Sequence, residues 1–149
     1  MIHEWAAEAL VSISFSPDSS TLVVARTYEF SFWNVETLQP IRRLLRDHAY
    51  YSSRVAFFPD GKLIALEVTP GVIHLEEAAT GRTIAKLTDP FGDRSTWMSF
   101  TPDGSQLVSS SFEAKALHIW DLRRIRTRLK AMGLDWKWPE FSPARVHRQ

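Results

Sequence analysis

The stretch SFSPDSSTLVV at residues 14–24 recurs as AFFPDGKLIAL at 56–66 and as SFTPDGSQLVS at 99–109. The prolines of these three copies stand 42 and then 43 residues apart. A fixed period of about 40–45 residues is typical of chains built from stacked copies of one structural unit. The sequence of 149 residues therefore predicts three such units.

Each unit has the pattern of β-strands. Val11, Ile13 and Phe15 alternate with serines, as in a strand that buries one face. A Pro-Asp pair followed by Gly or Ser then supplies a turn, because proline fixes its own φ and aspartate bonds the nearby backbone. Apolar runs such as TLVVA and KLIALEV follow, as expected of strands covered on both faces. Units one and two add a third and a fourth run, so we expect antiparallel sheets of four short strands.

Together these units resemble WD40 repeats, which form the four-stranded blades of β-propellers. Besides the F-x-P-D-G turns, the resemblance rests on three short motifs: HIWDL at 118–122, FWNV at 32–35 and AATG at 78–81. Asp47-His48 stands where the family often has Gly-His, and Glu76 stands where the second unit should have tryptophan. The resemblance implies an all-β fold over residues 1–122, with blades at about 5–46, 47–89 and 90–122.

The third unit departs from the other two after its HIWDL motif. Leu122, Ile125, Leu129 and Met132 recur at helical spacing, with arginines largely off this apolar stripe, and Gly133 stands where a helix ends. We therefore expect the third blade to lack its outer strand. Residues 123–149 should instead form a short amphipathic helix and an irregular tail, which Trp136 and Trp138 anchor either to this chain or to the missing part of the ring.

Three blades alone would leave two apolar sheet faces open, whereas propellers have 4–8 blades in a closed ring. We expect the chain to complete its ring by self-association, since two copies give six blades, or to complement another chain that supplies the remaining blades. The pattern also resembles the C-terminal part of larger bacterial multi-repeat WD40 proteins. A fragment without independent activity is therefore an alternative.

The composition of the chain limits the classes of partner that we expect. The chain is 44% hydrophobic, and no apolar run approaches the ~18 residues of a membrane span, so no membrane partner is expected. A net charge of +1 argues against nucleic acid. The absence of cysteine excludes disulfides and thiolate metal ligands. The N-terminal residues lack the pattern of a secretion signal, so a cytoplasmic location is expected.

The sequence has no phosphate-binding loop, zinc-hydrolase motif, nucleophile elbow or calcium loop. We therefore expect no enzyme, no cofactor and no metal site. His74 and His118 stand at equivalent positions, where a structural role is favoured over metal binding. Glu76 and Glu77 point to opposite faces of a strand, and both are expected at a solvated edge. The recurring aspartates are interpreted as turn residues: Asp18, Asp60 and Asp103.

The alternative of a catalytic or ligand-binding propeller needs equivalent polar residues from several blades at the central channel, and the units share no such set. A protein or peptide partner is favoured instead, because tyrosine, tryptophan and arginine are enriched at interaction hot spots. Such residues occur in the predicted loops of one propeller edge, where packing against neighbouring blades is the alternative role. The candidate partner-binding residues are Tyr28, Tyr50, Tyr51, Arg94, Trp97 and Phe112. The basic helix is expected to dock by its apolar stripe, with its basic face in solvent. Binding of an acidic partner, an anionic membrane or nucleic acid by residues 123–130 is the alternative.

Overall fold

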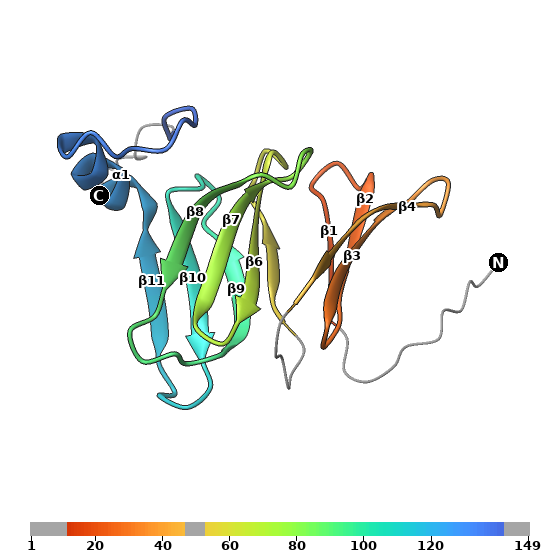
Figure 1. Cartoon of the computed structure of the whole chain (residues 1–149), viewed down its shortest axis with the longest axis horizontal. Coiled ribbons are helices and arrows are strands. Elements are labelled where there is room, and N and C mark those ends of the chain that lie inside the picture. The colour runs from red at the N-terminus through yellow and green to blue at the C-terminus, as the bar shows by residue number, and fades with distance from the viewer. Residues whose placement is uncertain (1–11, 47–52, 142–149) are drawn as a thin grey trace, which may run out of the picture.

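The computed structural model describes residues 12–46 and 53–141. These residues form three antiparallel sheets that lie side by side, followed by one helix (Figure 1). The predicted all-β fold is thus confirmed, including a third sheet that has three strands in the described part. Val11 and Asp47-His48 lie outside the described residues.

We refer to the three sheets as the first, second and third blades. Each is a meander in which sequential strands pair, and β5 lies beside both β1 and β9. The first blade contains β1 (Ser12–Phe15), β2 (Thr21–Ala25), β3 (Glu29–Asn34) and β4 (Pro40–Leu45). The second contains β5 (Val55–Phe57), β6 (Leu63–Thr69), β7 (Val72–Glu77) and β8 (Thr83–Thr88). The third contains β9 (Ser95–Phe100), β10 (Gln106–Ser111) and β11 (Leu117–Asp121), and it runs directly into α1 (Leu122–Ala131).

The recurring aspartates close the turns between the first two strands of each blade, as predicted. Asp18 accepts hydrogen bonds from the Ser16 hydroxyl (2.6 Å) and the Ser20 backbone N–H (3.0 Å). These bonds lower the pKa of Asp18 to about 2. In the third blade the turn also requires glycine. Gly104 has φ +70°, and a β-carbon there would overlap the Phe58 ring of the second blade.

Two apolar cores hold the blades together, one at each junction. The core between the first and second blades contains Phe30 and Phe32 on one side and Ile64 and Leu66 on the other. The core between the second and third blades contains Leu75, Met98 and Leu107 and continues to Leu122 of α1. The second blade, which has a neighbour on both sides, accordingly has an almost fully buried β6 (Figure 1). This explains the continuous apolar run of its sequence.

An ion pair crosses the first junction at the position where the second unit lacks its tryptophan. Arg42 of β4 donates to Glu76 of β7 at 3.2 Å, and its guanidinium lies 3.7 Å from the centre of the Phe32 ring. Glu76 is 2% exposed, so the expectation that it lies at a solvated edge is wrong. Burial raises the pKa of Glu76, and Arg42 acts in the opposite direction. At the second junction the equivalent positions hold Ala85 and Trp120, both in the apolar core.

A second buried carboxylate ties the second blade to the third. Glu67 of β6 accepts a hydrogen bond from the backbone N–H of Ser95 at 2.7 Å, and its carbonyl accepts one from the Ser53 hydroxyl. Burial raises the pKa of Glu67, while hydrogen bonds from Ser95 and Gly71 and the charge of Arg46 act against this effect. The sequence gives no local sign of this contact, because Ser95 is 28 residues away.

The helix α1 docks on the third blade by Leu122 and Ile125. Asp121 caps its first turn by accepting from the Arg124 N–H at 2.8 Å, and Gly133 follows its end at φ +72°. Met132 is exposed, so the apolar stripe ends before this predicted member.

The basic face of α1 is only partly in solvent, contrary to expectation, because Arg126 is buried. Its guanidinium makes two bonds of 3.0 Å to Asp135 and also donates to the carbonyls of Trp138 and Pro139. These bonds hold the tail against α1. Trp138 packs against the core between the second and third blades, which confirms that it anchors the tail to this chain.

Candidate interaction surfaces

The turns between the second and third strands of each blade and the connection between the second and third blades gather along one edge of the structure, at the bottom of Figure 1. We call this the loop edge and define it by Tyr28, Phe91, Arg94, Phe112 and Glu113. Three of the predicted partner-binding residues belong to it. Tyr50 and Tyr51 lie outside the described residues, so nothing tests their role.

At the third blade the loop edge is held in a defined shape. The Arg94 guanidinium stacks 3.8 Å from the centre of the Phe112 ring, and its Nε lies 3.5 Å from a Glu113 carboxylate oxygen. Beneath them, Asp93 accepts from the backbone N–H groups of Glu113 (3.1 Å) and Ala114 (2.9 Å) and from the Ser111 hydroxyl. Burial acts to raise the pKa of Asp93, but these hydrogen bonds hold it below its ordinary value. The result is an exposed aromatic ring on an anchored turn.

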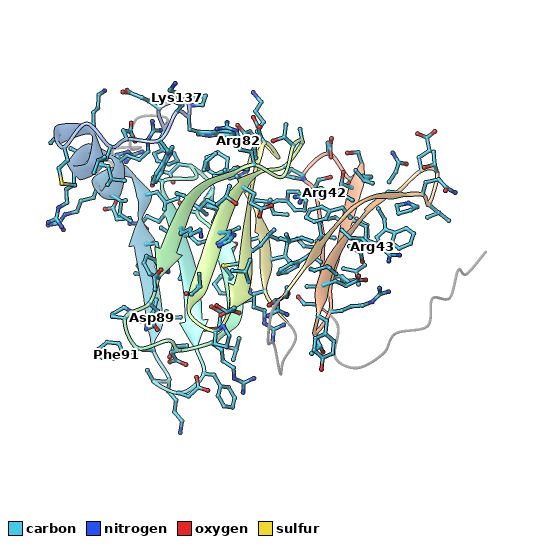
Figure 2. The ribbon with its side chains drawn as sticks, in the orientation of Figure 1. Arg42, Arg43, Arg82, Asp89, Phe91 and Lys137 are labelled. Carbon is cyan, nitrogen blue, oxygen red and sulfur yellow. The ribbon has the colours of Figure 1, made fainter. Side chains whose placement is uncertain are left out.

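Trp97 lies elsewhere than expected, and exposed Phe91 was not among the predicted partner-binding residues. Trp97 does not lie in the loop that precedes the third blade but within β9, on the sheet face that points away from the second blade. Phe91, in the connection between the second and third blades, is 89% exposed (Figure 2). The preceding pair Asp89-Pro90 was the available sequence signal, since Asp-Pro favours the start of a turn.

The two equivalent histidines lie in different surroundings. His118 Nδ1 is 3.8 Å from Asp89 of the neighbouring blade. His74 Nδ1 is 3.9 Å from Glu76 of its own strand, and burial with Lys86 nearby lowers the pKa of His74. Within residues 12–46 and 53–141, no three histidine, aspartate or glutamate side chains come together as a possible metal site. In the same part of the chain, α1 is the helix present, and it is too short to cross a membrane.

The outward side of the first blade carries exposed apolar side chains, although Val24 on the same side is buried. The strand register places Ile13, Phe15 and Trp33 on the side of the sheet opposite the core residues Phe30 and Phe32. Leu45 of β4 shares this side and is exposed. We call this surface the first-blade face. Its members are Ile13, Phe15, Leu22, Val24, Trp33, Arg43 and Leu45.

The far side of the third blade is open as well. Trp97, Leu117 and Ile119 lie on the side of the sheet opposite Leu107 and are each more than half exposed. We call this surface the third-blade face. Its members are Trp97, Ser99, Val108, Ser110, Leu117 and Ile119.

Equivalent positions of the repeat indicate that both faces are junction surfaces that no blade of the described residues 12–46 and 53–141 covers. Ile13 is 62% exposed, whereas its equivalents are covered by the preceding blade: Val55 at 8% and Met98 at 6%. Ile119 is 60% exposed, whereas its equivalents are covered by the following blade: Phe32 at 2% and Leu75 at 0%. The residue type is apolar at all six positions, so the exposure depends on whether a neighbouring blade is present.

Comparisons with known proteins find similarity in sequence to WD repeat proteins, although no family model matches the chain. The chain is 27% identical over 116 residues to WD repeat-containing protein 3 of Homo sapiens, across 77% of the chain and 12% of that protein. It is 30% identical over 93 residues to WD repeat and SOCS box-containing protein 1 of Mus musculus, across 60% of the chain and 22% of that protein. The chain spans less than a quarter of the length of either relative.

Proposed function

We propose that this chain, which belongs to the WD40-repeat family, is a non-catalytic protein-interaction scaffold. Its three blades are part of a propeller ring that a second copy or another chain completes. The loop edge of that ring then binds a protein or peptide partner.

The observation that carries the proposal is the exposure of apolar junction positions at both end blades. Three side chains on each face, all more than half exposed, amount to roughly 300 Å² of apolar surface, taking 150–250 Å² for a complete large side chain. Covering that area is worth about 8 kcal/mol per face at about 25 cal/mol per Å². This is comparable to the net stability of a whole domain. The two faces therefore favour a blade-like partner over solvent.

The loop edge supplies the second part of the proposal. Phe112 is presented by a turn that Asp93 anchors, and Arg94 is stacked on its ring. Because the Phe112 ring and the Arg94 guanidinium are already held in place, little conformational entropy is lost at this position when a partner binds. Arginine is also among the residue types enriched at interaction hot spots. Exposed Tyr28 and Phe91 extend this surface toward the other blades.

The requirement for covered faces can be tested with the variant Ile13→Asp/Ile119→Asp, which places a charge on each face. We expect the parent chain to be larger than a monomer by light scattering and the variant to be a folded monomer, because an unpaired carboxylate opposes burial. Phe91→Asp is the matched control: it removes an exposed apolar side chain outside both faces and should behave as the parent. If all three proteins are identical folded monomers, the end faces need no partner.

The loop edge can be tested by placing a photo-crosslinking residue at Phe112 in the full chain in cells. Arg82, on the opposite edge (Figure 2), is the control position. We expect a discrete crosslinked protein from position 112 and none from position 82. The purified partner should then bind Phe112→Ala at least about tenfold more weakly than the parent, in the range of a single hot-spot residue. Equal crosslinking from both edges would exclude the loop edge as the binding surface.

A further inference from the structure

We infer that the ring is completed by a second copy of this chain, joined head to tail. The third-blade face of each copy packs on the first-blade face of the other, which gives a six-bladed ring with two-fold symmetry. This inference rests on the proposed function, because it names the partner that covers the two open faces. Six blades fall within the 4–8 blades of known propellers.

The internal junctions indicate which surfaces belong together. At the first junction, Val23, Phe30 and Phe32 of the first blade share one core with residues of the second. The third-blade face carries the equivalents of these three residues, since the strand register aligns Val108 with Ile119 just as it aligns Val23 with Phe32. The third-blade face is therefore the same kind of surface that the first blade presents to the second.

The first-blade face corresponds to the other half of the junction. Val55 and Ile64 are the second-blade residues that pack on the first blade, and their equivalents on the first-blade face are Ile13 and Leu22. A contact between the third-blade face and the first-blade face would thus repeat an existing junction. A contact between two first-blade faces would instead bring together surfaces that neither internal junction combines.

The positions of the faces fit a closed pair. They lie at opposite ends of the row of blades (Figure 1), so each copy offers one surface of each kind. Contacts between unlike surfaces form rings when the rotation closes. Successive blades of a propeller rotate about one axis, and a second copy continues that rotation through the same junction geometry.

The buried area also favours two contacts between the same two copies over a single contact. We call each contact between a third-blade face and a first-blade face a joint. A single joint covers two faces, or roughly 600 Å² of apolar surface, which is below the range of stable interfaces. Two joints between the same two molecules cover roughly 1,200 Å², at the lower limit of that range. The closed dimer is therefore favoured over an open row of copies.

The polar groups on these faces do not oppose the contact. The Ser110 hydroxyl already has a partner in the Thr96 hydroxyl at 2.6 Å. Arg43 belongs to the outermost strand β4, where its charged end can remain in water while its aliphatic part covers apolar surface (Figure 2).

The test uses the two single variants Ile13→Asp and Ile119→Asp in separate and mixed samples. Each variant retains one intact face, and that face has no intact complement among copies of its own kind. We expect each alone to be a folded monomer, with self-association weakened at least about 100-fold by the buried charge. An equimolar mixture should form a heterodimer through one intact joint, at higher concentration than the parent dimer requires. If aspartate unfolds a blade, Ile13→Thr and Ile119→Thr retain β-branched side chains for the same experiment.

The outcomes separate the inference from the proposed function. A mixture that associates no more strongly than either single variant alone, while the double variant still changes the association of the parent, overturns head-to-tail pairing but leaves the requirement for covered faces. A dimer that survives in either single variant also overturns the inference, because it would join like faces. A parent chain that is itself a folded monomer with no response to either substitution overturns both.

Discussion

Replacing Arg42 by alanine should destabilise the chain by about 3 kcal/mol, because it leaves the Glu76 carboxylate buried without its counter-charge. Glu76 is 2% exposed and its partner lies 3.2 Å away, so water cannot replace the lost guanidinium. Arg42 is itself partly exposed, which sets the magnitude at the lower end of the range for buried pairs. The loss of its stacking on Phe32 is included in this value.

Urea unfolding followed by circular dichroism measures this effect, at one fixed protein concentration because self-association would change the apparent stability. Arg82→Ala is the control, since Arg82 is exposed and its closest approach to Glu77 is 3.7 Å. We expect the control to change the free energy of unfolding by less than about 0.5 kcal/mol.

The second junction suggests a double variant that should restore the stability lost in Arg42→Ala. Ala85 and Trp120 occupy there the positions of Arg42 and Glu76, so Arg42→Ala/Glu76→Trp reproduces at the first junction a combination that the chain already uses. We expect the double variant to recover to within about 1 kcal/mol of the parent. If it is as unstable as the sum of its two single variants, the ion pair and the combination of alanine with tryptophan are not alternative solutions of the same junction.

The effect of pH has a definite sign. Burial raises the pKa of Glu76 in the folded chain, so its contribution to stability is present at low pH and is lost as pH rises through the folded-state pKa. Arg42 limits that rise, and its removal should increase it. The deficit of Arg42→Ala relative to the parent should therefore be smaller near pH 5 than near pH 8. An equal deficit at both pH values would refute the role assigned to the Glu76 charge.

Three further predictions concern the other contacts. Glu67→Gln keeps an acceptor for the Ser95 N–H and should cost less than about 1 kcal/mol, whereas Glu67→Ala should cost about 2 kcal/mol in urea unfolding; equal costs would contradict the assigned bond. Arg126→Ala should release the tail at Asp135, so limited proteolysis should cut the tail at least about tenfold faster than in the control Arg128→Ala, whose side chain is exposed. Equal cutting rates would contradict the role of Arg126 in holding the tail. Gly104→Ala should destabilise by at least about 2 kcal/mol more than Gly92→Ala in thermal unfolding, because both have positive φ but a β-carbon is blocked only at Gly104; equal losses would show that Phe58 can move aside.

The parts of the fold that depend on local chemistry were predictable from the sequence. The turn at Asp18 follows from proline and aspartate within a few positions, and Ser19 has the positive φ (+61°) that glycine adopts in the other two units. The third blade ends after β11 because helical spacing replaces strand alternation from Leu122 onward. Such signals need no knowledge of the neighbouring blade.

Contacts between blades were harder to predict from the sequence. Glu76 was assigned to a solvated edge because its partner Arg42 is 34 residues away and in another sheet. The available signal was a comparison between units at these two positions. Ala85 stands in the second unit where the first has Arg42, and Trp120 stands in the third unit where the second has Glu76. Trp97 was assigned to a loop because Ser95 and Thr96 interrupt the apolar pattern, although both belong to β9.

The buried arginine of α1 had a signal in the sequence. Arg126 follows Leu122 by four residues and precedes Leu129 by three, which places it on the apolar stripe. A charged residue at such a position requires a partner, and Asp135 provides it after the helix ends.

The mass of the purified chain in solution tests most directly whether copies of this chain cover each other's end blades. Light scattering on a sizing column, across a concentration series, should give a discrete species of twice the 17.1 kDa chain mass that persists on dilution. A folded species of 17.1 kDa at every concentration would contradict closure by a second copy.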